Sequence, residues 1–457
     1  MKHAPTLVAT LALVACAGPE PKRPTAVEAA QAALPAAAFP NASGTGTAAA
    51  ELPWAQAFRG ARLQQLIPLA LANNRDLRVA AANIESARAT AAMRDADFWP
   101  TVNAGLSGSR VPNASGGITS NYQAGLQVTA YEVDLFGRLR SLGSAAQAQL
   151  LAAEANQQAV RNALIAAVAT TEIALQADEA LLRITRDTLA SREQSLSLIR
   201  QRFEGGITGE LDLRAGESAL QAARVALAQT QRQRALDENA LVLLLGSALP
   251  AGLPAPTGAL ADFEPLAELP AGLPSEVLTR RPDIRQAEAQ LAAADANIGA
   301  ARAAFFPRIT LTGSLGTTSS QLDGLFKNTA WSFAPSLIQP LFDAGRNRAN
   351  LAGARAARDA ATAQYEKAVQ SAFRDVADAL AGRATLAEQR TAQAALVAAE
   401  ARRLALAEER YRAGISSSLD VLDAQRSLFT AQQALVQVQS LRAQNLVAVY
   451  RVLGGGN

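Results

Sequence analysis

The residue types that most often carry out chemistry in proteins are almost absent from this chain. Its 457 residues include one histidine, His3, and one cysteine, Cys16, both close to the N-terminus. If this N-terminal segment is a cleaved leader, the mature chain has no histidine and begins at its only cysteine. That excludes catalysis by Ser-His-Asp or Cys-His groups and a zinc site built from His and Cys. Carboxylate catalysis and Mg²⁺ binding by Asp and Glu stay open. Because the chain offers no other candidate residues, we expect neither an enzyme nor a bound metal or cofactor.

Cys16 follows a segment that has the features of a secretory signal. Lys2 supplies a positive charge, and residues 7–15 are apolar except for Thr10. This run is shorter than the ~20 apolar residues that a transmembrane helix needs, and it is typical of a signal peptide. Residues 13–16, Leu-Val-Ala-Cys, resemble a bacterial lipobox, in which the chain is cleaved before the cysteine and the thiol is diacylated. The alternative is a chance cysteine behind a plain signal peptide.

We therefore predict a signal peptide at residues 1–15 and a covalent lipid on Cys16. Residues 16–60 are rich in Pro, Ala, Gly and Thr, which predicts an extended tether. Ala17, and not Asp, follows the cysteine, which fits the sorting of such lipoproteins to the outer membrane. The expected location is the outer membrane, with the chain anchored by its lipid.

Composition excludes one further class of function and favours helices. The chain has 43 Lys and Arg against 40 Asp and Glu, a net charge of +3, and most charges are scattered singly. We therefore expect no nucleic-acid binding, which requires clustered basic residues. Ala, Leu, Gln and Arg dominate long stretches and aromatic residues make up only 5%, which favours tightly packed long helices.

The second half of the chain repeats the first. Residues 74–77 align with 281–284, and residues 211–213 align with 419–421, at an offset of about 207 or 208 residues. Further anchors follow in the same order at the same offset, which indicates a tandem duplication. We predict a first repeat at residues 61–246, a Pro/Gly-rich linker at 247–274 and a second repeat at 275–457.

Each repeat predicts the same series of elements: one helix, two strands and then two very long helices. Apolar Ile309 and Leu311 alternate with polar neighbours, which is the period of a strand with two unlike faces. Val168, Leu175 and Leu182 recur every seven residues, the pattern of supercoiled helices. We expect first helices at 62–97 and 275–304, strands near 101–110, 122–134, 307–316 and 331–342, and a helix over 138–203 about 100 Å long.

Four strands in one chain determine how a membrane could be crossed. Single-chain outer-membrane barrels begin at about eight strands, and open sheet edges cannot lie in lipid, where their N–H and C=O groups find no partner. Copies of the chain must therefore assemble, and three copies supply twelve strands. The predicted fold class is mainly α with a transmembrane β-barrel that is completed only when copies of the chain assemble.

Three further motifs are specific: Tyr-Glu-Val-Asp-Leu-Phe-Gly-Arg at 131–138, Arg-Arg-Pro-Asp-Ile at 280–284 followed by Phe-Phe-Pro at 305–307, and Tyr-Arg-Ala-Gly at 411–414 with Leu-Asp-Val-Leu-Asp-Ala-Gln at 419–425. They resemble signatures of the TolC/OprM-like outer-membrane factors, in particular the NodT-type efflux lipoproteins. The resemblance covers nearly the whole chain after the predicted tether. It implies a homotrimer with a twelve-stranded barrel in the outer membrane and an α-helical tunnel across the periplasm.

The resemblance also implies partners and a function. The periplasmic tip is expected to dock onto an adaptor (membrane fusion) protein coupled to an inner-membrane RND transporter. The chain would then be the outer-membrane channel of a tripartite efflux system, passively conducting small molecules and drugs. A duct for type I protein secretion is the nearest alternative. A structural coiled-coil lipoprotein is an alternative of another class, but it explains neither the strands nor the duplication.

The turns between the long helices are the expected position of a gate. Gly206 and Gly414 lie at these tips, where glycine accepts the turn geometry. Members of the resembled family close this end with rings of inward acidic side chains, and the motif match assigns Asp420 and Asp423 to them. Two rings of three carboxylates would favour cations. The alternative is that Asp420 belongs to a helix start, where a carboxylate accepts from free N–H groups.

The resemblance further implies a latch between Tyr411 and Asp212 that holds the tip closed. An arginine that some relatives carry in the second loop is replaced here by Ser416. The alternative for Asp212 is again a helix start. The candidate gate residues are therefore Asp420, Asp423, Asp212 and Tyr411.

Overall fold

The computed structural model describes residues 53–112, 114, 116–260 and 281–455. All of them belong to one compact unit, Ala38–Asn457. The predicted signal peptide, the lipid site Cys16, most of the tether and part of the linker lie outside the described residues, as does the predicted start of the helix at 275.

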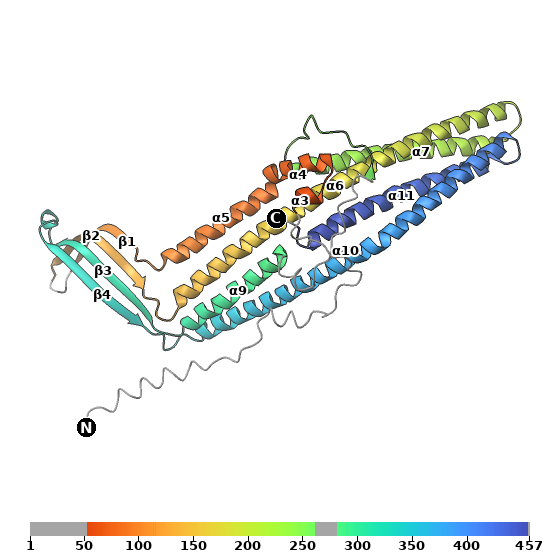
Figure 1. The fold of residues 1–457 in the computed structure, drawn as a ribbon. Coiled ribbons are helices and arrows are strands. Elements are labelled where there is room, and N and C mark those ends of the chain that lie inside the picture. The colour runs from red at the N-terminus through yellow and green to blue at the C-terminus, as the bar shows by residue number, and fades with distance from the viewer. Residues whose placement is uncertain (1–52, 113, 115, 261–280, 456–457) are drawn as a thin grey trace, which may run out of the picture. The chain divides into compact units, whose positions relative to one another are not determined.

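The described chain runs twice through the same series of elements (Figure 1). The first series comprises α3 (Trp54–Ala57), α4 (Ala61–Asn73), α5 (Arg75–Ala96), β1 (Val102–Pro112), β2 (Ile118–Glu132), α6 (Arg138–Glu204) and α7 (Glu210–Leu245). The second comprises α9 (Pro282–Ala303), β3 (Arg308–Ser319), the 3₁₀ turn η3 (Leu322–Gly324), β4 (Thr329–Ile338), α10 (Arg346–Arg412) and α11 (Ser418–Val452).

The long helices and the four strands that the sequence predicts are confirmed, and the bounds of the strands shift by up to four residues. The helix predicted over 62–97 is two helices, because Asn74 is extended (φ −59°, ψ 135°) and its side chain caps α5 by accepting from the N–H of Leu77. The strand predicted to 342 ends at Ile338, just before Gln339 and Pro340.

The four strands form one antiparallel sheet in the order β1-β2-β3-β4. Gly125 of β2 stands opposite Gly316 of β3, and a Cβ on either residue would overlap the backbone of the partner strand. A bulge between Val128 and Tyr131, with Ala130 at φ 53°, shifts the register near the end of β2. β1 and β4 are the edges of the sheet, and within the described chain neither has a partner on its outer side.

The long helices pair as two antiparallel hairpins, α6 with α7 and α10 with α11 (Figure 1). Helix α6 also contacts α5, α9 and α11, so it joins the two halves of the chain. The main core lies around the middle of α6, where Val168 and Ile173 pack among fully buried residues of α4 and α7 such as Ile67 and Leu241. Among the described helices none is both long and apolar enough to span a membrane.

Pseudo-equivalent residues tie the short helix of each half to the end of the last long helix. Asn74 donates from Nδ2 to the carbonyl of Leu244 (2.9 Å), at the end of α7. Arg281 donates from a guanidinium nitrogen to the carbonyl of Val452 (3.1 Å), at the end of α11, and pairs with Asp283. Both side chains satisfy carbonyls that a helix end leaves free, so this part of the motif at 280–284 has a structural role.

The described part of the linker is bound to the middle of α6. Glu172 is fully buried and pairs with Arg62, and it accepts from Gln176 (2.8 Å). The amide oxygen of Gln176 in turn accepts from the N–H groups of Thr257 and Gly258 (3.0 and 2.9 Å). A buried carboxylate is stable only when it is paired and hydrogen-bonded, so this network holds the linker against the helix.

Candidate gate at the helical tips

Both hairpins turn at the predicted glycines. Gly206, between α6 and α7, has φ 69°, and Gly414, between α10 and α11, has φ 75°. In the first turn the N–H of Ile207 donates back to the carbonyl of Arg202 (2.8 Å), and the equivalent bond closes the second turn (2.9 Å). Such backward bonds with a left-handed glycine end helices in general, so these two residues allow each hairpin to reverse.

Asp420 is held by the start of α11. Its carboxylate accepts from the backbone N–H of Ser417 (3.0 Å), and the Ser417 hydroxyl accepts from the N–H of Asp420 (3.3 Å). This is a capping box, in which the residue before the helix and the third residue of the helix satisfy each other's free N–H groups. The geometry therefore supports the helix-start interpretation of Asp420.

Asp423 lies one turn further along α11, and its charge is already compensated. It accepts from Arg426 on its own helix (2.5 Å) and from Arg403 of α10. These two guanidinium groups, Arg426 first, hold the pKa of Asp423 below its ordinary value. Because Arg403 also pairs with Glu400 (3.1 Å), two carboxylates meet two guanidiniums in each chain. Within one chain the charge of Asp423 is therefore compensated by arginines, while the rings of carboxylates in a trimer stay a prediction.

Asp212 links the two hairpins, but through a different partner from the one expected. Its carboxylate accepts from the hydroxyl of Ser418 at the start of α11 (2.7 Å) and from Thr208 in its own turn. The hydroxyls of Thr208 and then Ser418 lower the pKa of Asp212, so the carboxylate is ionised at neutral pH. Within the described chain no hydrogen bond joins Tyr411 to Asp212, and the Tyr411 hydroxyl has no hydrogen-bond partner.

Tyr411 also joins the hairpins, through Arg202 of α6. The guanidinium carbon of Arg202 lies 4.2 Å from the centre of the Tyr411 ring, and one of its nitrogens donates to the Tyr411 carbonyl (3.1 Å). The ring is 8% exposed and packs with Ile199 and Val421. The four residues Arg202, Asp212, Tyr411 and Ser418, which we call the hairpin clasp, therefore hold the tips of the two hairpins together.

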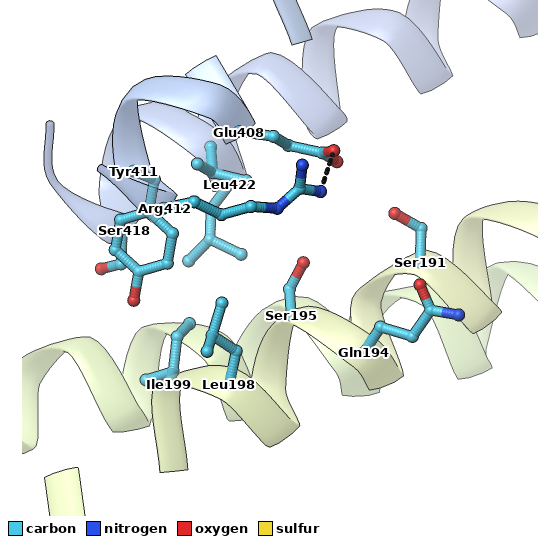
Figure 2. Close-up of a pocket in the computed structure, with 11 residues that line it drawn as sticks. Ser191, Gln194, Ser195, Leu198, Ile199, Glu408, Tyr411, Arg412, Ser418 and Leu422 are labelled. Atoms are coloured by element: carbon cyan, nitrogen blue, oxygen red, sulfur yellow. Dashed lines mark hydrogen bonds and ion pairs between the residues drawn. The ribbon is translucent and has the colours of Figure 1, made fainter. Parts of the chain in front are cut away.

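A second layer of polar contacts crosses from α6 to α11 above the hairpin clasp. Gln425 donates to the hydroxyls of Ser191 (3.0 Å) and Ser195 (2.8 Å). Arg192 is 7% exposed and donates to the carbonyl of Ala219 in α7 (2.6 Å), while its Nε has no hydrogen-bond partner within the described residues. Burial lowers the pKa of Arg192. Between this layer and the clasp a cavity of about 120 Å³ separates α6 from the second hairpin (Figure 2).

Comparison with known proteins agrees with the fold and with the two hairpins. The family described as outer membrane efflux protein matches residues 66–247 and 273–455. The chain is 47% identical over 418 residues to the toluene efflux pump outer membrane protein TtgC of Pseudomonas putida, covering 90% of this chain and 86% of that one. It is 43% identical over 425 residues to the outer membrane protein OprJ of Pseudomonas aeruginosa, covering 90% and 88%.

A solved structure shows the same fold. The open state of the MtrE outer membrane channel of Neisseria gonorrhoeae is 39% identical, with a TM-score of 0.86 over 96% of this chain and 97% of that one. The fold is that of outer-membrane efflux channels, and the chain belongs to the outer membrane efflux protein family. It is an outer-membrane component of an efflux system.

Proposed function

We propose that three copies of this chain close their sheets into one twelve-stranded barrel and their hairpins into one tunnel. The observation that carries this proposal is the pair of outer edges, β1 and β4, which have 11 and 10 residues. That length suits a tilted strand crossing a bilayer. Trp331 and Phe333 of β4 are 76% and 62% exposed, and Leu106 of β1 is 72% exposed, so the sheet presents apolar side chains to its surroundings.

The number of copies follows from the width that a passage needs. Two copies would give eight strands, and the interior of such a barrel is just wide enough for its own side chains. Three copies give twelve strands and leave an open lumen. Helices α6 and α10 each have 67 residues and therefore extend about 100 Å, a length that suits a tunnel crossing the periplasm.

The substrate in this proposal is a small molecule that diffuses through the lumen, and the chain performs no catalysis. TtgC is named for toluene efflux, and another relative of P. putida, ArpC, is named for antibiotic efflux. These names favour efflux over type I protein secretion. The lipid on Cys16, outside the described residues, would anchor each copy to the outer membrane.

The partner at the tip is an adaptor protein coupled to an inner-membrane RND transporter. Both tip turns expose aliphatic side chains at pseudo-equivalent positions: Ile207 (76%) and Leu211 (85%), and Ile415 (68%) and Leu419 (64%). Exposed apolar patches of this kind are typical of interaction sites. We propose that the adaptor covers these four side chains, while the hairpin clasp keeps the tip closed until it docks.

The mass and conductance of the purified full-length protein test the assembly. We expect a mass of three chains by native mass spectrometry in detergent and stepwise conductance in planar bilayers. A monomer or dimer without pores would refute the proposal. Replacing Leu211 and Leu419 together by serine should abolish co-purification of the adaptor without changing the trimer mass, and retained adaptor would exclude the aliphatic tip as its docking site.

A further inference from the structure

The strands and the helices joined to them follow the same order. The sheet has the order β1-β2-β3-β4, and the helices have the order α5-α6-α9-α10, because α5 packs on α6, α6 on α9 and α9 on α10. Figure 1 shows α5 and α10 at opposite edges of this row of helices. The two halves of the chain therefore meet where β2 pairs with β3 and where α6 packs on α9. The outer edges of the described chain are β1 with α5 and β4 with α10.

Each residue of the inner helices has a counterpart on the edge helices. Helices α5 and α9 both have 22 residues, and α6 and α10 both have 67, so the duplicated halves align here without a gap. The contact of α6 with α9 thus predicts an equivalent contact of α10 with α5. Because α5 and α10 lie at opposite edges of one chain, this equivalent contact can only join α10 to α5 of a second copy.

Helices α6 and α9 approach closely at Ser141 and Gly299. A Cβ added to Gly299 would lie 2.6 Å from the hydroxyl oxygen of Ser141 and 3.3 Å from its Cβ, so the serine fits because the facing residue has no side chain. The counterparts at the outer edges are Ala349 on α10 and Ala92 on α5, and both are exposed. An alanine can replace the glycine there because Ala349 lacks the hydroxyl that would overlap it. Both pairs have the same number of side-chain heavy atoms, divided differently between the two helices.

The surfaces around these residues are covered on the inner helices and open on the edge helices. Ala303, one turn beyond the close approach on α9, is buried, whereas its counterpart Ala96 on α5 is exposed. Ala145, one turn beyond Ser141 on the same face of α6, is also buried, whereas its counterpart Gly353 on α10 is exposed. The same position therefore accepts an alanine in a packed helix pair. The edge helices carry the small side chains of a close helix contact without the neighbour that would cover them.

An aromatic contact indicates the same neighbour. Phe306, which follows α9, stacks on Phe136, which follows β2, with 4.8 Å between the ring centroids and 10° between the ring planes. The counterpart of Phe306 is Trp99, which follows α5 and is 75% exposed. Phe342 follows β4 as Phe136 follows β2, and it is 91% exposed. Exposed apolar side chains of this size are typical of interaction sites, and a second copy would bring the two rings to the same edge.

We propose that α10 of each copy packs on α5 of the next copy, with Ala349 against Ala92 of the partner subunit. The proposal rests on the proposed function, and it names the helices and the residues through which the copies recognise each other. The two pairs also keep the halves in alternating order. Ser141 against Ala92 of the partner subunit would overlap, and overlap in a packed contact is unfavourable, so α5 of a second copy does not replace α9.

Cysteine pairs test this contact on the purified full-length protein in detergent. Disulfides form between Cβ atoms about 3.5–4.5 Å apart, and the 3.3 Å at Ser141 and Gly299 is close to that range. After mild oxidation, Ala92→Cys combined with Ala349→Cys should link neighbouring copies. Most of the protein should then run at the mass of three chains on a denaturing gel without reductant, and reduction should return it to the mass of one chain.

Two matched cysteine pairs serve as controls. Gly299→Cys with Ser141→Cys should form its bridge within one chain and run at the mass of one chain. Ala92→Cys with Ala392→Cys places the second thiol about 65 Å further along α10 and should give no link.

The native mass separates the two ways in which the proposal can fail. A native trimer in which Ala92→Cys and Ala349→Cys form no bridge, or form it within one chain, would overturn the inference and leave the proposed assembly intact. A native mass of one chain would refute the proposed function together with the contact that rests on it.

Discussion

Asp178 provides the sharpest prediction because its protonation is coupled to the packing of α6 on α7. The residue is 6% exposed. Burial, and then a hydrogen bond with the carboxyl of Asp237, raise the pKa of Asp178 to about 7. Arg234 lies nearby and opposes this rise, but it also pairs with Glu179 (3.0 Å) and Glu238 (3.1 Å). Two carboxyl groups that share a hydrogen bond need one proton between them.

The sign of the pH dependence follows from this raised pKa. Between about pH 4 and pH 7 the folded protein holds a proton on Asp178 that the unfolded chain has lost, so the free energy of unfolding falls as the pH rises through this window. A rise from the ordinary value of 3.8 to about 7 corresponds to about 4 kcal/mol per chain above pH 7. With an unfolding entropy of about 2.1 cal/mol/K per residue, this is roughly 4–5 °C in Tm.

The substitution Asp178→Asn removes the titration and keeps the shape of the side chain. Its amide can donate to Asp237 at any pH, so no shared proton is needed. We expect Tm of the wild-type trimer, measured by scanning calorimetry in detergent, to lie roughly 4–5 °C below that of Asp178→Asn at pH 8.5 and to approach it at pH 5. Asp187→Asn, at an exposed position of the same helix, is the control and should follow the wild type.

Two results would refute this reasoning. One is a difference in Tm between the wild type and Asp178→Asn that is the same at both pH values. The other is an equal pH response in Asp178→Asn and Asp187→Asn. Either would mean that the carboxyl pair does not hold a proton that the unfolded chain lacks.

Four further predictions follow from the other contacts. Arg202→Ala removes the cation–π contact and one hydrogen bond of the hairpin clasp, about 1–3 kcal/mol together, and should raise bilayer conductance, whereas an unchanged record would exclude Arg202 from the gate. Asp423→Ala leaves two guanidiniums per chain with fewer partners and should shift the reversal potential toward anion selectivity, and a shift toward cations would contradict the charge balance. Gly316→Ala should prevent correct sheet pairing and trimer formation, while Gly353→Ala, on an open helix surface, should assemble normally. Cys16→Ser should lack the mass of the lipid and should leave the membrane fraction more readily, and an unchanged intact mass would exclude lipidation.

Periodicity allowed much of the fold to be predicted. The seven-residue spacing through Val168, Leu175 and Leu182 places one face of a helix against its neighbours, and it predicted α6 almost to its last residue. Period-two alternation predicted four strands in the same way. The break at Asn74 was not predicted, although asparagine is a preferred N-cap, because its place is also set by the distant carbonyl of Leu244.

In the candidate site, too, some residues could be predicted from the sequence and some contacts could not. Gly206 and Gly414 could be found from the sequence, since a turn with positive φ is a local requirement that glycine meets best. The partner of Tyr411 could not. Arg202 lies about two hundred residues away in the chain, and nothing around it differs from an ordinary basic residue in the last turn of a helix.

The amino-acid sequence by itself determined the local conformation, the duplicated order of elements and the family, because each depends on residue types at short or regular spacing. The tertiary structure decided which charges meet. In the structure Asp420 caps a helix start, Asp423 pairs with two arginines, and Asp212 accepts a hydrogen bond from Ser418. The physical reason is that hydrogen bonds and ion pairs act only over a few ångströms, so their partners are known only once the two hairpins lie side by side.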